Sequence, residues 1–579
     1  MTCKERILSN DYADIIIDFQ IPEIFQYQYD VDYCYHNVEG EFGILFARRS
    51  DLPNITLTTL SYSFLPKCYG LMQLEDETDP SVSMEFDTTS LIEAGILQAQ
   101  GQPLELTGRG VTIGFIDTGI RYENEVFHNE SGQSRITAIW DQTIQTGMPP
   151  EGFEYGTEYT REQINEALAS ENPRSIVPST DEIGHGTAIA SVAAGSRLSN
   201  NRRFIGAAPD CNIVVVKLKQ IKPYLRDYYL IPEDVPCYQE TDLIQAIQYL
   251  QKFAVSLYSP LVICLGIGTN LGDHTGVSAL ARYMDLIMTR KSRAIINCAG
   301  NEGNAAHHYH GELTRAQPTQ DVEIRVGGEM GGFVMDFWGG VPYIYTVTIR
   351  SPGGETIQWI NPQIHRPQEF TFIFEKTRII VEYLVVEQNS GSELIRFRME
   401  RPTPGIWTVS VRTEIDIVNG SFDIWLPITQ FLEAETIFLQ PTPYTTLTDP
   451  GYVHRSVTTT AYNDTNRSLY VNSGRGYARD GYVKPDIAAP GVDVSTVLGS
   501  RTGTSMAAAI TAGGVAQIMQ WSVVDGNNVL ADSFDVRNYL IRGARREATM
   551  SYPNREWGYG RLNIEGVFRF LARTSYSGF

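Results

Sequence analysis

Three polar residues stand beside glycines at points where the chain could support nucleophilic catalysis. Asp117 ends the apolar run 111–116, His185 lies between two glycines, and Ser505 follows a Gly-Thr pair. Glycine lets a backbone approach a substrate closely, and a helix start favours developing negative charge. A histidine can take the proton of a serine hydroxyl while an aspartate orients the imidazole and stabilises its charged form. We therefore predict Ser505 as nucleophile, His185 as general base and Asp117 as the orienting carboxylate.

The elements around these residues alternate between strand and helix. Strands are predicted at residues 111–116, 213–218, 261–266 and 294–299, and helices at residues 186–194, 242–254 and 276–291. This alternation predicts an α/β fold in which helices cover both faces of a parallel sheet. Ligand sites of such sheets lie at the carboxyl ends of the strands, which is where Asp117 stands.

Two further units are predicted, one before the alternating strands and helices and one inserted within them. The first segment carries short apolar runs at residues 15–17, 42–46 and 55–60, and the acidic stretch 75–80 after it is typical of a linker. From about residue 321 to 440, strands follow one another without helices, which predicts an inserted antiparallel β-sandwich. We expect boundaries that divide the chain into residues 1–87, 88–312, 313–445 and 446–579.

Composition excludes several classes of partner. The 579 residues are 42% hydrophobic and 20% charged, with a formal net charge of -22. Such a negative field disfavours nucleic acids and anionic membranes as partners, and mildly favours basic substrates. No apolar run approaches the roughly 18 residues of a membrane span.

The N-terminal residues and the cysteines indicate in which cellular compartment the protein is expected. The first residues contain no apolar segment of a secretory signal peptide, so we expect synthesis without export and a cytoplasmic location. Seven scattered cysteines without a C-x-x-C pair favour buried or free thiols in a reducing compartment.

The order Asp117, His185, Ser505, with each residue inside a glycine-bearing motif, resembles the subtilisin family of serine proteases (subtilases). The segment Val483–Gly491 is similar to the stretch that precedes the family's serine. The resemblance implies a subtilisin-like fold and an endopeptidase that works through an acyl-enzyme on Ser505. It implies a protein or peptide substrate and no cofactor or metal.

The same resemblance implies roles for further residues. The segment Asn297–Gly303 is similar to the family's oxyanion motif, which places Asn301 as the oxyanion donor beside the Ser505 backbone N–H. It puts the substrate-binding strand at Cys264, Leu265 and Gly266, with Ala299 and Gly300 as the opposite wall of the pocket. Cys264 and Cys298, the two cysteines of these segments, are predicted to be small strand residues and not nucleophiles.

Within subtilases, the chain resembles the Csp branch of clostridial germination proteases. Ala509 stands where the family serine motif usually has proline, and the segment Ile139–Gln142 and the large β insertion also match this branch. The resemblance implies an N-terminal α+β prodomain, an inserted jelly roll and a role in spore germination with a spore-associated location. We expect the enzyme to cut its own prodomain between Leu71 and Ser90, and the prodomain could stay bound as an inhibitor.

Two other functions remain open at this point. Some Csp-like proteins have lost triad residues, so the chain could be a binding or sensing protein built on the subtilase scaffold; the filled triad argues against this. An intracellular subtilase of general protein turnover fits the missing leader equally well. The histidines at residues 307, 308 and 310 are predicted to lie in a solvated loop and not at a metal site.

Overall fold

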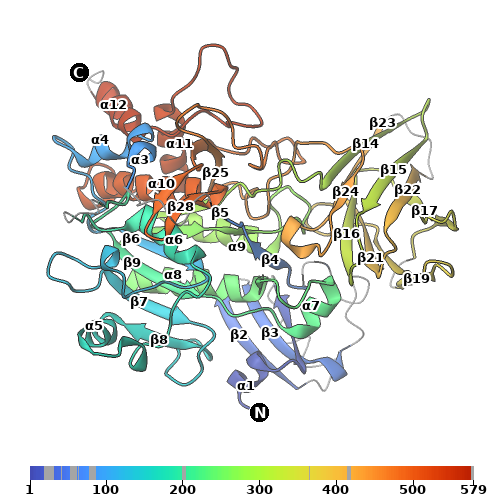
Figure 1. Ribbon diagram of the computed structural model, residues 1–579, viewed down its shortest axis with the longest axis horizontal. Helices are drawn as coiled ribbons and strands as arrows, with labels where there is room; N and C mark the ends of the chain where they lie inside the picture. Colours follow the sequence, from blue (N-terminus) through green and yellow to red (C-terminus); the bar gives the residue numbers. More distant parts are fainter. Residues whose placement is uncertain are drawn as a thin grey trace.

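The structure is a computed structural model that describes residues 1–17, 32–40, 42–52, 62, 64–76, 86–198, 204–363, 366–413 and 419–575. Figure 1 shows an α/β unit with a small strand-containing unit below it and a separate group of strands on the right. The predicted α/β fold with additional N-terminal and all-β parts is confirmed.

The α/β unit is built on an eight-stranded sheet in the order β26-β25-β13-β11-β6-β9-β7-β8. Seven strands are parallel, and only β8 runs antiparallel, beside β7. The bounds are β6 Thr112–Asp117, β7 Ile136–Asp141, β8 Thr157–Thr160, β9 Asn212–Lys217, β11 Leu261–Leu265, β13 Arg293–Cys298, β25 Val457–Tyr462 and β26 Ile487–Pro490. The parallel order brings the carboxyl end of β6, with Asp117, to the same sheet edge as its neighbours.

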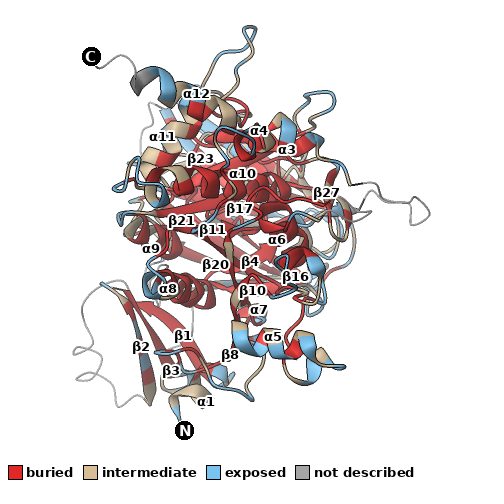
Figure 2. Cartoon of the chain, turned by 90° about the vertical axis from the view of Figure 1, so that its left-hand side faces the viewer, coloured by how far each residue is buried: buried red, intermediate tan, exposed pale blue. Residues whose placement is uncertain are grey.

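Helices cover both faces of this sheet because its strands are apolar on both faces. In β11, Val262 and Cys264 belong to one buried cluster, and Ile263 and Leu265 belong to another. The first cluster includes α6 (His185–Ala194) and α10 (Thr504–Met519), and the second includes α8 (Glu240–Ser256) and α9 (Ala279–Met288). Figure 2 shows the continuous buried layer that results. Burial of each large apolar side chain contributes about 1.5–3 kcal/mol, so the two clusters fix the sheet between its helices.

The helix α10 is apolar on all sides because it lies inside the protein. With its continuation it spans Thr504–Val524, which is long and apolar enough by composition alone to cross a membrane. However, 83% of its most apolar window is buried in the protein. A core helix of the α/β unit accounts for this composition.

The N-terminal unit contains α1 (Cys3–Leu8) and an antiparallel sheet in the order β1-β3-β2, with β1 Tyr12–Ile17, β2 Tyr33–Glu39 and β3 Phe42–Arg48. A disulfide joins Cys3 to Cys34, with a Cα–Cα distance of 5.5 Å. The expectation that all seven cysteines are unpaired thiols is therefore wrong for these two. Packing of α1 on β2 brings them together, which their spacing in the sequence does not reveal.

The later part of the N-terminal segment differs from a simple linker. Glu75–Asp76 form β5, which pairs with β28 (Gly499–Thr502) next to the start of α10. The first two residues of the predicted acidic linker are thus part of a sheet. The rest of that stretch and the strand predicted at residues 55–60 lie outside the described residues.

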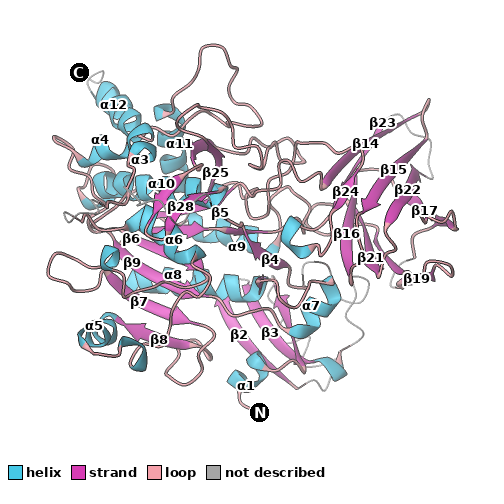
Figure 3. Cartoon of the chain, in the orientation of Figure 1, coloured by secondary structure: helices cyan, strands magenta, loops and turns pink. Residues whose placement is uncertain are grey.

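The all-β unit consists of two antiparallel sheets (Figure 3). One sheet has the order β14-β23-β16-β21-β20-β19 and the other the order β18-β17-β22-β15-β24. Both share one buried cluster, to which Phe337 and Phe397 contribute from the first sheet and Val347 and Trp407 from the second. The strands are β14 His308–Thr314, β15 Thr319–Val326, β16 Gly332–Gly339, β17 Tyr345–Arg350, β18 Thr356–Ile360, β19 Gln368–Thr371, β20 Arg378–Leu384, β21 Glu393–Glu400, β22 Gly405–Thr413, β23 Asn419–Trp425 and β24 Thr436–Phe438.

The histidines near residue 308 belong to this unit and not to a solvated loop. His308 and His310 lie in β14, and both contact the Asp423 carboxylate, at 3.0 and 2.7 Å. His307 contacts Glu302 at 2.7 Å. Strand pairing between β14 and β23 places these groups side by side, so the loop prediction is wrong.

Candidate active site

The three predicted catalytic side chains come from three separate elements that meet at one edge of the sheet. Asp117 is the last residue of β6, His185 the first of α6, and Ser505 the second of α10. The exposed fractions of the three residues are 2%, 5% and 0%. Gly184 has a φ of +92°, a conformation that glycine adopts without strain and that lets α6 begin directly at His185.

The carboxylate of Asp117 holds the His185 ring in one orientation. Nδ1 of His185 lies 2.8 Å from Oδ1 and 3.0 Å from Oδ2 of Asp117. The backbone N–H of Thr118 donates to the same Oδ1 at 2.8 Å and fixes the carboxylate in turn. Nε2 of the imidazole is thereby directed to the other side, toward the cleft.

The pKa of His185 is raised above its ordinary value. Burial alone would lower this pKa, but the attraction of Asp117 and hydrogen bonds to Asp117 and to the Met72 carbonyl outweigh it. Stabilisation of the imidazolium is what a general base needs at the moment when it has taken a proton.

The cleft is occupied by a segment of the chain's own N-terminal part. The carbonyl oxygen of Met72 lies 3.0 Å from Nε2 of His185 and accepts a hydrogen bond of 3.4 Å from Oγ of Ser505. Ser505 Oγ also lies 3.3 Å from the carbonyl oxygen of Gly266. The base and the candidate nucleophile thus converge on a single peptide group.

This segment binds as a strand. β4 (Cys68–Leu71) is the middle strand of a three-stranded sheet, with β10 (Cys237–Gln239) on one side and β12 (Ile267–Gly268) on the other. Both pairings are antiparallel. The backbone N–H of Met72 extends the ladder by donating to the carbonyl of Gly266 at 3.0 Å. Backbone pairing on both sides holds the segment extended across the site.

Asn301 presents its amide to the same segment. Its Oδ1 accepts hydrogen bonds from the Thr504 N–H and hydroxyl, at 3.1 and 2.8 Å, so its NH₂ group faces the cleft. Nδ2 donates to the carbonyl of Gln73 at 2.8 Å. This carbonyl is one peptide beyond that of Met72, so the donor lies next to the bond over Ser505.

The predicted substrate-binding strand is displaced by two residues. Cys264 and Leu265 lie inside β11, where parallel strands pair on both sides, and within the predicted segment it is Gly266 that forms a backbone hydrogen bond with the bound strand. The residues that pair with β4 are Ile267 and Gly268. The sheet explains the difference, because a strand with two neighbours has no free edge to offer a peptide.

The opposite wall contains a residue that the sequence motifs did not indicate. Ala299 accepts a backbone hydrogen bond from Thr448 at 3.1 Å, and Gly300 accepts one from Gly474 at 2.8 Å. A Cβ at Gly300, which has a φ of +85°, would meet the Thr448 hydroxyl at 2.5 Å. This hydroxyl lies 3.9 Å from the sulfur of Met72, so Thr448 borders the pocket that holds the Met72 side chain.

Sequence reasoning also missed Asp181. This buried carboxylate accepts hydrogen bonds from the N–H of Gly184 at 2.7 Å and from the N–H and hydroxyl of Thr187 at 2.8 and 2.7 Å. It accepts a further one from the Thr118 hydroxyl at 2.8 Å. Asp181 therefore joins the end of β6 to the start of α6. A short acidic residue just before a predicted helix was the available signal.

The two cysteines near the site are not reactive thiolates. Burial raises the pKa of Cys298 to about 12 and raises that of Cys264 well above its ordinary value. Both side chains are buried in the core beside the sheet. The thiols therefore remain protonated, as expected for small strand residues.

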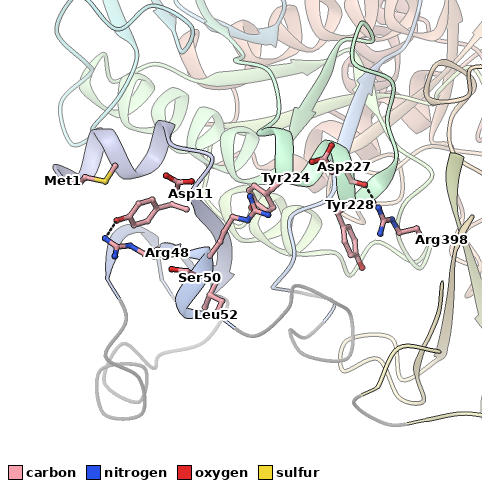
Figure 4. A pocket seen from close by; sticks show the side chains of 11 residues that line it. Met1, Asp11, Arg48, Ser50, Leu52, Tyr224, Asp227, Tyr228 and Arg398 are labelled. Carbon is pink, nitrogen blue, oxygen red and sulfur yellow. Dashed lines mark hydrogen bonds between the residues drawn. The ribbon is translucent and has the colours of Figure 1, made fainter. Parts of the chain in front are cut away.

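A cavity lies away from the three candidate catalytic residues. A cavity of about 880 Å³ is lined by residues of the N-terminal unit, of α7 (Pro223–Tyr229) and of β21. Figure 4 shows Arg398 from β21 facing the backbone of Asp227 in α7, with a hydrogen bond of 3.1 Å. None of the candidate catalytic residues lines this cavity. It marks where the three units meet.

Parts of the chain are similar to known proteins. A family model described as the subtilase family matches residues 108–324 and 439–560. A solved structure of the Clostridium perfringens CspB protease is 30% identical, with a TM-score of 0.74, and the match covers 84% of this chain and 98% of that one. The unmatched stretch 325–438 falls in the all-β unit.

Two curated Arabidopsis thaliana proteins are similar over shorter stretches. Subtilisin-like protease SBT3.6 is 26% identical over 214 residues, or 34% of this chain, and subtilisin-like protease SBT3.5 is 33% identical over 129 residues, or 19% of this chain. The matches span 26% and 16% of the length of these two relatives.

Proposed function

The chain belongs to the subtilase family of serine proteases, and from this premise we propose that it is an endopeptidase with Asp117, His185 and Ser505 as its catalytic triad. The observation that carries the proposal is the convergence of Ser505 Oγ and His185 Nε2 on the Met72 carbonyl. Substrates are proteins or peptides bound as a strand between β10 and β12.

The chemistry follows from the positions of these groups. His185 takes the proton of Ser505 as Oγ attacks the carbonyl carbon, and then gives it to the nitrogen of the leaving amine. Asp117 stabilises the imidazolium formed between these two steps. Water then attacks the acyl-enzyme in a second cycle of the same proton transfers and releases the acid.

We propose that Asn301 and the Ser505 N–H stabilise the tetrahedral oxyanion. The Asn301 amide is held by Thr504 with its NH₂ toward the peptide group beside Ser505. In the uncut chain it binds the Gln73 carbonyl, so the Met72 carbonyl must turn toward it as the oxyanion forms. In subtilisin, loss of such a donor raises the barrier by roughly 3–4 kcal/mol.

The first substrate that we propose is the enzyme itself, cut between Met72 and Gln73. The Met72 carbonyl faces both catalytic groups, and the chain runs on continuously through β5 on the far side of the site. This bond lies inside the interval Leu71 to Ser90 predicted from the sequence. The N-terminal segment would then be a prodomain.

We further propose that the prodomain stays bound after the cut and blocks the cleft. Besides the pairing of β4, the Asp14 carboxylate contacts the Lys222 ammonium, and both side chains are buried, with 1% and 4% exposed. Lys222 also donates to the carbonyl of Tyr12 at 3.0 Å, and the Tyr224 hydroxyl binds the N–H of Asp14 at 2.8 Å. These contacts do not involve the bond that is cut.

The similarity to the CspB protease supports a narrower role. We propose limited proteolysis that activates a protein substrate during spore germination, as the Csp resemblance implies, with a spore-associated location. A binding or sensing protein on the same scaffold is the alternative, and the filled triad with its hydrogen-bonded His185 argues against it.

Intact-mass spectrometry of the purified protein tests the proposal. We expect two fragments that meet between Met72 and Gln73, and one intact chain for Ser505→Ala. Labelling by a fluorophosphonate probe separates an enzyme from a binding protein. The prodomain fragment is removed under denaturing conditions and the remaining chain is refolded, and this chain should take up label. Re-addition of the fragment should prevent labelling. A folded chain that neither cuts itself nor takes up label would support the binding role.

A further inference from the structure

The side chains of the bound segment enter pockets that are shaped for particular residue types. Counting back from the bond over Ser505, Met72 is the first residue, Gly70 the third and Tyr69 the fourth. The register is fixed by the pairing of Gly70 with Gly268 and of Leu71 with Ile267, and by the Met72 N–H bond to Gly266.

The Tyr69 side chain is fully buried, and its hydroxyl meets a carboxylate. It donates to Oδ2 of Asp449 at 2.8 Å, and the Ser278 hydroxyl donates to the same oxygen at 3.0 Å. The exposed fractions of Tyr69 and Asp449 are 0% and 4%. The apolar part of the ring belongs to the buried cluster that contains Tyr238, Ile267 and Leu280. The pocket is therefore apolar around the ring and has an acceptor at its end.

Asp449 is held in place independently of the tyrosine. Its backbone exchanges hydrogen bonds with Thr269, at 3.0 and 2.9 Å, directly after β12. Burial raises the pKa of its carboxyl to about 6, while the nearby Lys67 ammonium and the Tyr69 and Ser278 hydroxyls favour the ionised form. An ionised carboxylate accepts hydrogen bonds and gives none, so this pocket favours a donor such as phenol over the apolar ring of phenylalanine.

The position of Gly70, directly before Leu71, is enclosed by Ile428 and Gln430, which follow β23 of the all-β unit. A Cβ on Gly70 would overlap the amide nitrogen of Gln430 and would lie 2.6 Å from Cδ1 of Ile428. The same Gln430 nitrogen donates to the Leu71 carbonyl at 2.8 Å, so it cannot move aside without losing that hydrogen bond. Any larger residue at this position would therefore have to displace the ends of the Gln430 and Ile428 side chains and would lose the hydrogen bond to Leu71, so the site favours glycine.

We propose that the cleft selects segments with a tyrosine four residues and a glycine three residues before the cut bond, with Asp449 and Gln430 as the residues that determine this specificity. The proposal rests on the proposed proteolytic function and deepens it. Protein substrates should present a Tyr-Gly pair in an extended stretch, in the same register as the chain's own segment.

The test is the rate of self-cleavage of the full chain after synthesis in a cell-free system, with samples denatured over time and the uncut fraction measured on gels. We expect Tyr69→Phe to lower the rate constant by at least about tenfold, because it leaves a buried carboxylate with one donor fewer. Tyr62→Phe is the matched control, since this buried tyrosine of the same segment has no hydroxyl partner among the described residues and should cut at the normal rate.

A double-mutant cycle assigns the effect to Asp449. In the Asp449→Ala background, the difference between tyrosine and phenylalanine at position 69 should fall to less than about twofold, because the acceptor is gone. Persistence of the full difference there would overturn the role of Asp449. Thermal unfolding of each variant in the Ser505→Ala background verifies that the chain is folded.

Glycine selection is tested at a second site that does not involve Asp449. Gly70→Ala should slow self-cleavage by at least about tenfold, and Gln430→Ala should restore part of the loss by removing the overlapping side chain. Normal rates for both Tyr69→Phe and Gly70→Ala would overturn the inference while the unsubstituted chain still cuts itself. If the unsubstituted chain does not cut at all, the proposed function fails instead.

Discussion

Nε2 of His185 lies 3.0 Å from the carbonyl oxygen of Met72, a residue 113 positions earlier in the chain. The contact places a peptide group of the chain itself beside both His185 and Ser505, with its carbonyl oxygen still turned toward the imidazole and not toward Asn301. In the proposed function, peptide cleavage and inhibition by the bound N-terminal segment therefore depend on the same contact. The predictions below separate the residues that act on the bond from those that hold the segment in place.

Replacement of Asp117 by asparagine should slow self-cleavage by about 10⁴-fold while the chain stays folded. Asparagine keeps the size of the side chain but favours the wrong tautomer of His185 and does not stabilise the imidazolium. Time courses of fragment formation by intact-mass spectrometry measure the rate. A loss of less than tenfold would show that Asp117 does not orient the base.

Self-cleavage should depend on pH with a midpoint above 6.5, the ordinary pKa of histidine, because the pKa of His185 is raised. His185 must be neutral to accept the Ser505 proton, so the rate falls as the pH drops through this raised pKa and is full above it. Cleavage rates of freshly refolded chain between pH 5 and 9 locate the midpoint. A midpoint below 6.5 would mean that desolvation outweighs the Asp117 carboxylate.

Asp181→Ala should lower both stability and the cleavage rate. The substitution leaves the N–H groups of Gly184 and Thr187 without their acceptor in a buried site, which costs about 1–3 kcal/mol. It also frees the start of α6, which carries His185. Thermal unfolding and cleavage time courses measure the two effects, and Asp234→Ala, on the surface, is the control. Equal behaviour of the two variants would exclude a positioning role.

Asp14→Ala should release the prodomain after the cut. Removal of one partner from a buried ion pair leaves the Lys222 ammonium uncompensated, at a cost of about 3–5 kcal/mol. Size-exclusion chromatography should show the two fragments together in the unsubstituted protein and apart in the variant. Asp14→Leu combined with Lys222→Met removes both charges and should restore much of the co-elution. Separation of the fragments without any substitution would contradict retention.

Glu393→Gln should stabilise the all-β unit at pH 8. Burial raises the pKa of Glu393 to about 8 from an ordinary 4.5, so the folded unit holds a proton that the unfolded chain loses. The stability from this group is therefore full below about pH 4.5 and is lost as the pH rises to about 8. Glutamine keeps the acceptor for the Tyr345 N–H without this penalty, which is on the order of 4 kcal/mol at pH 8. Thermal unfolding at pH 5 and 8 measures the effect, and an equal change in melting temperature at both would contradict it.

Local sequence patterns were sufficient for the four central strands of the α/β unit and for the helices beside them, whereas the outer strands β7, β8, β25 and β26 were not predicted. The predicted strand 213–218 is β9 at Asn212–Lys217, and the predicted helix 242–254 is α8 at Glu240–Ser256. The periodicity of an apolar strand or an amphipathic helix is visible in consecutive residues, so a single stretch of sequence is enough to recognise each element. The glycine-bearing motifs likewise marked the residues that the structure brings together at the sheet edge.

Contacts between distant segments could not be predicted in this way. The substrate strand was placed two residues too early because its free edge exists only once β6 and β13 have paired with β11. The Cys3–Cys34 disulfide and the role of Asp181 depend in the same way on elements packing together.

The sequence by itself determined the family and predicted the chemistry, since an aspartate, a histidine and a serine in glycine-bearing motifs mark a candidate nucleophile, its base and the carboxylate that orients the base. The tertiary structure alone decided what lies in the cleft. The segment from Cys68 to Gln73 carries no motif, and it becomes the occupant because β10 and β12 leave room for one strand between them. Strand pairing joins residues hundreds of positions apart, so only the folded chain places Met72 over Ser505 and Tyr69 against Asp449.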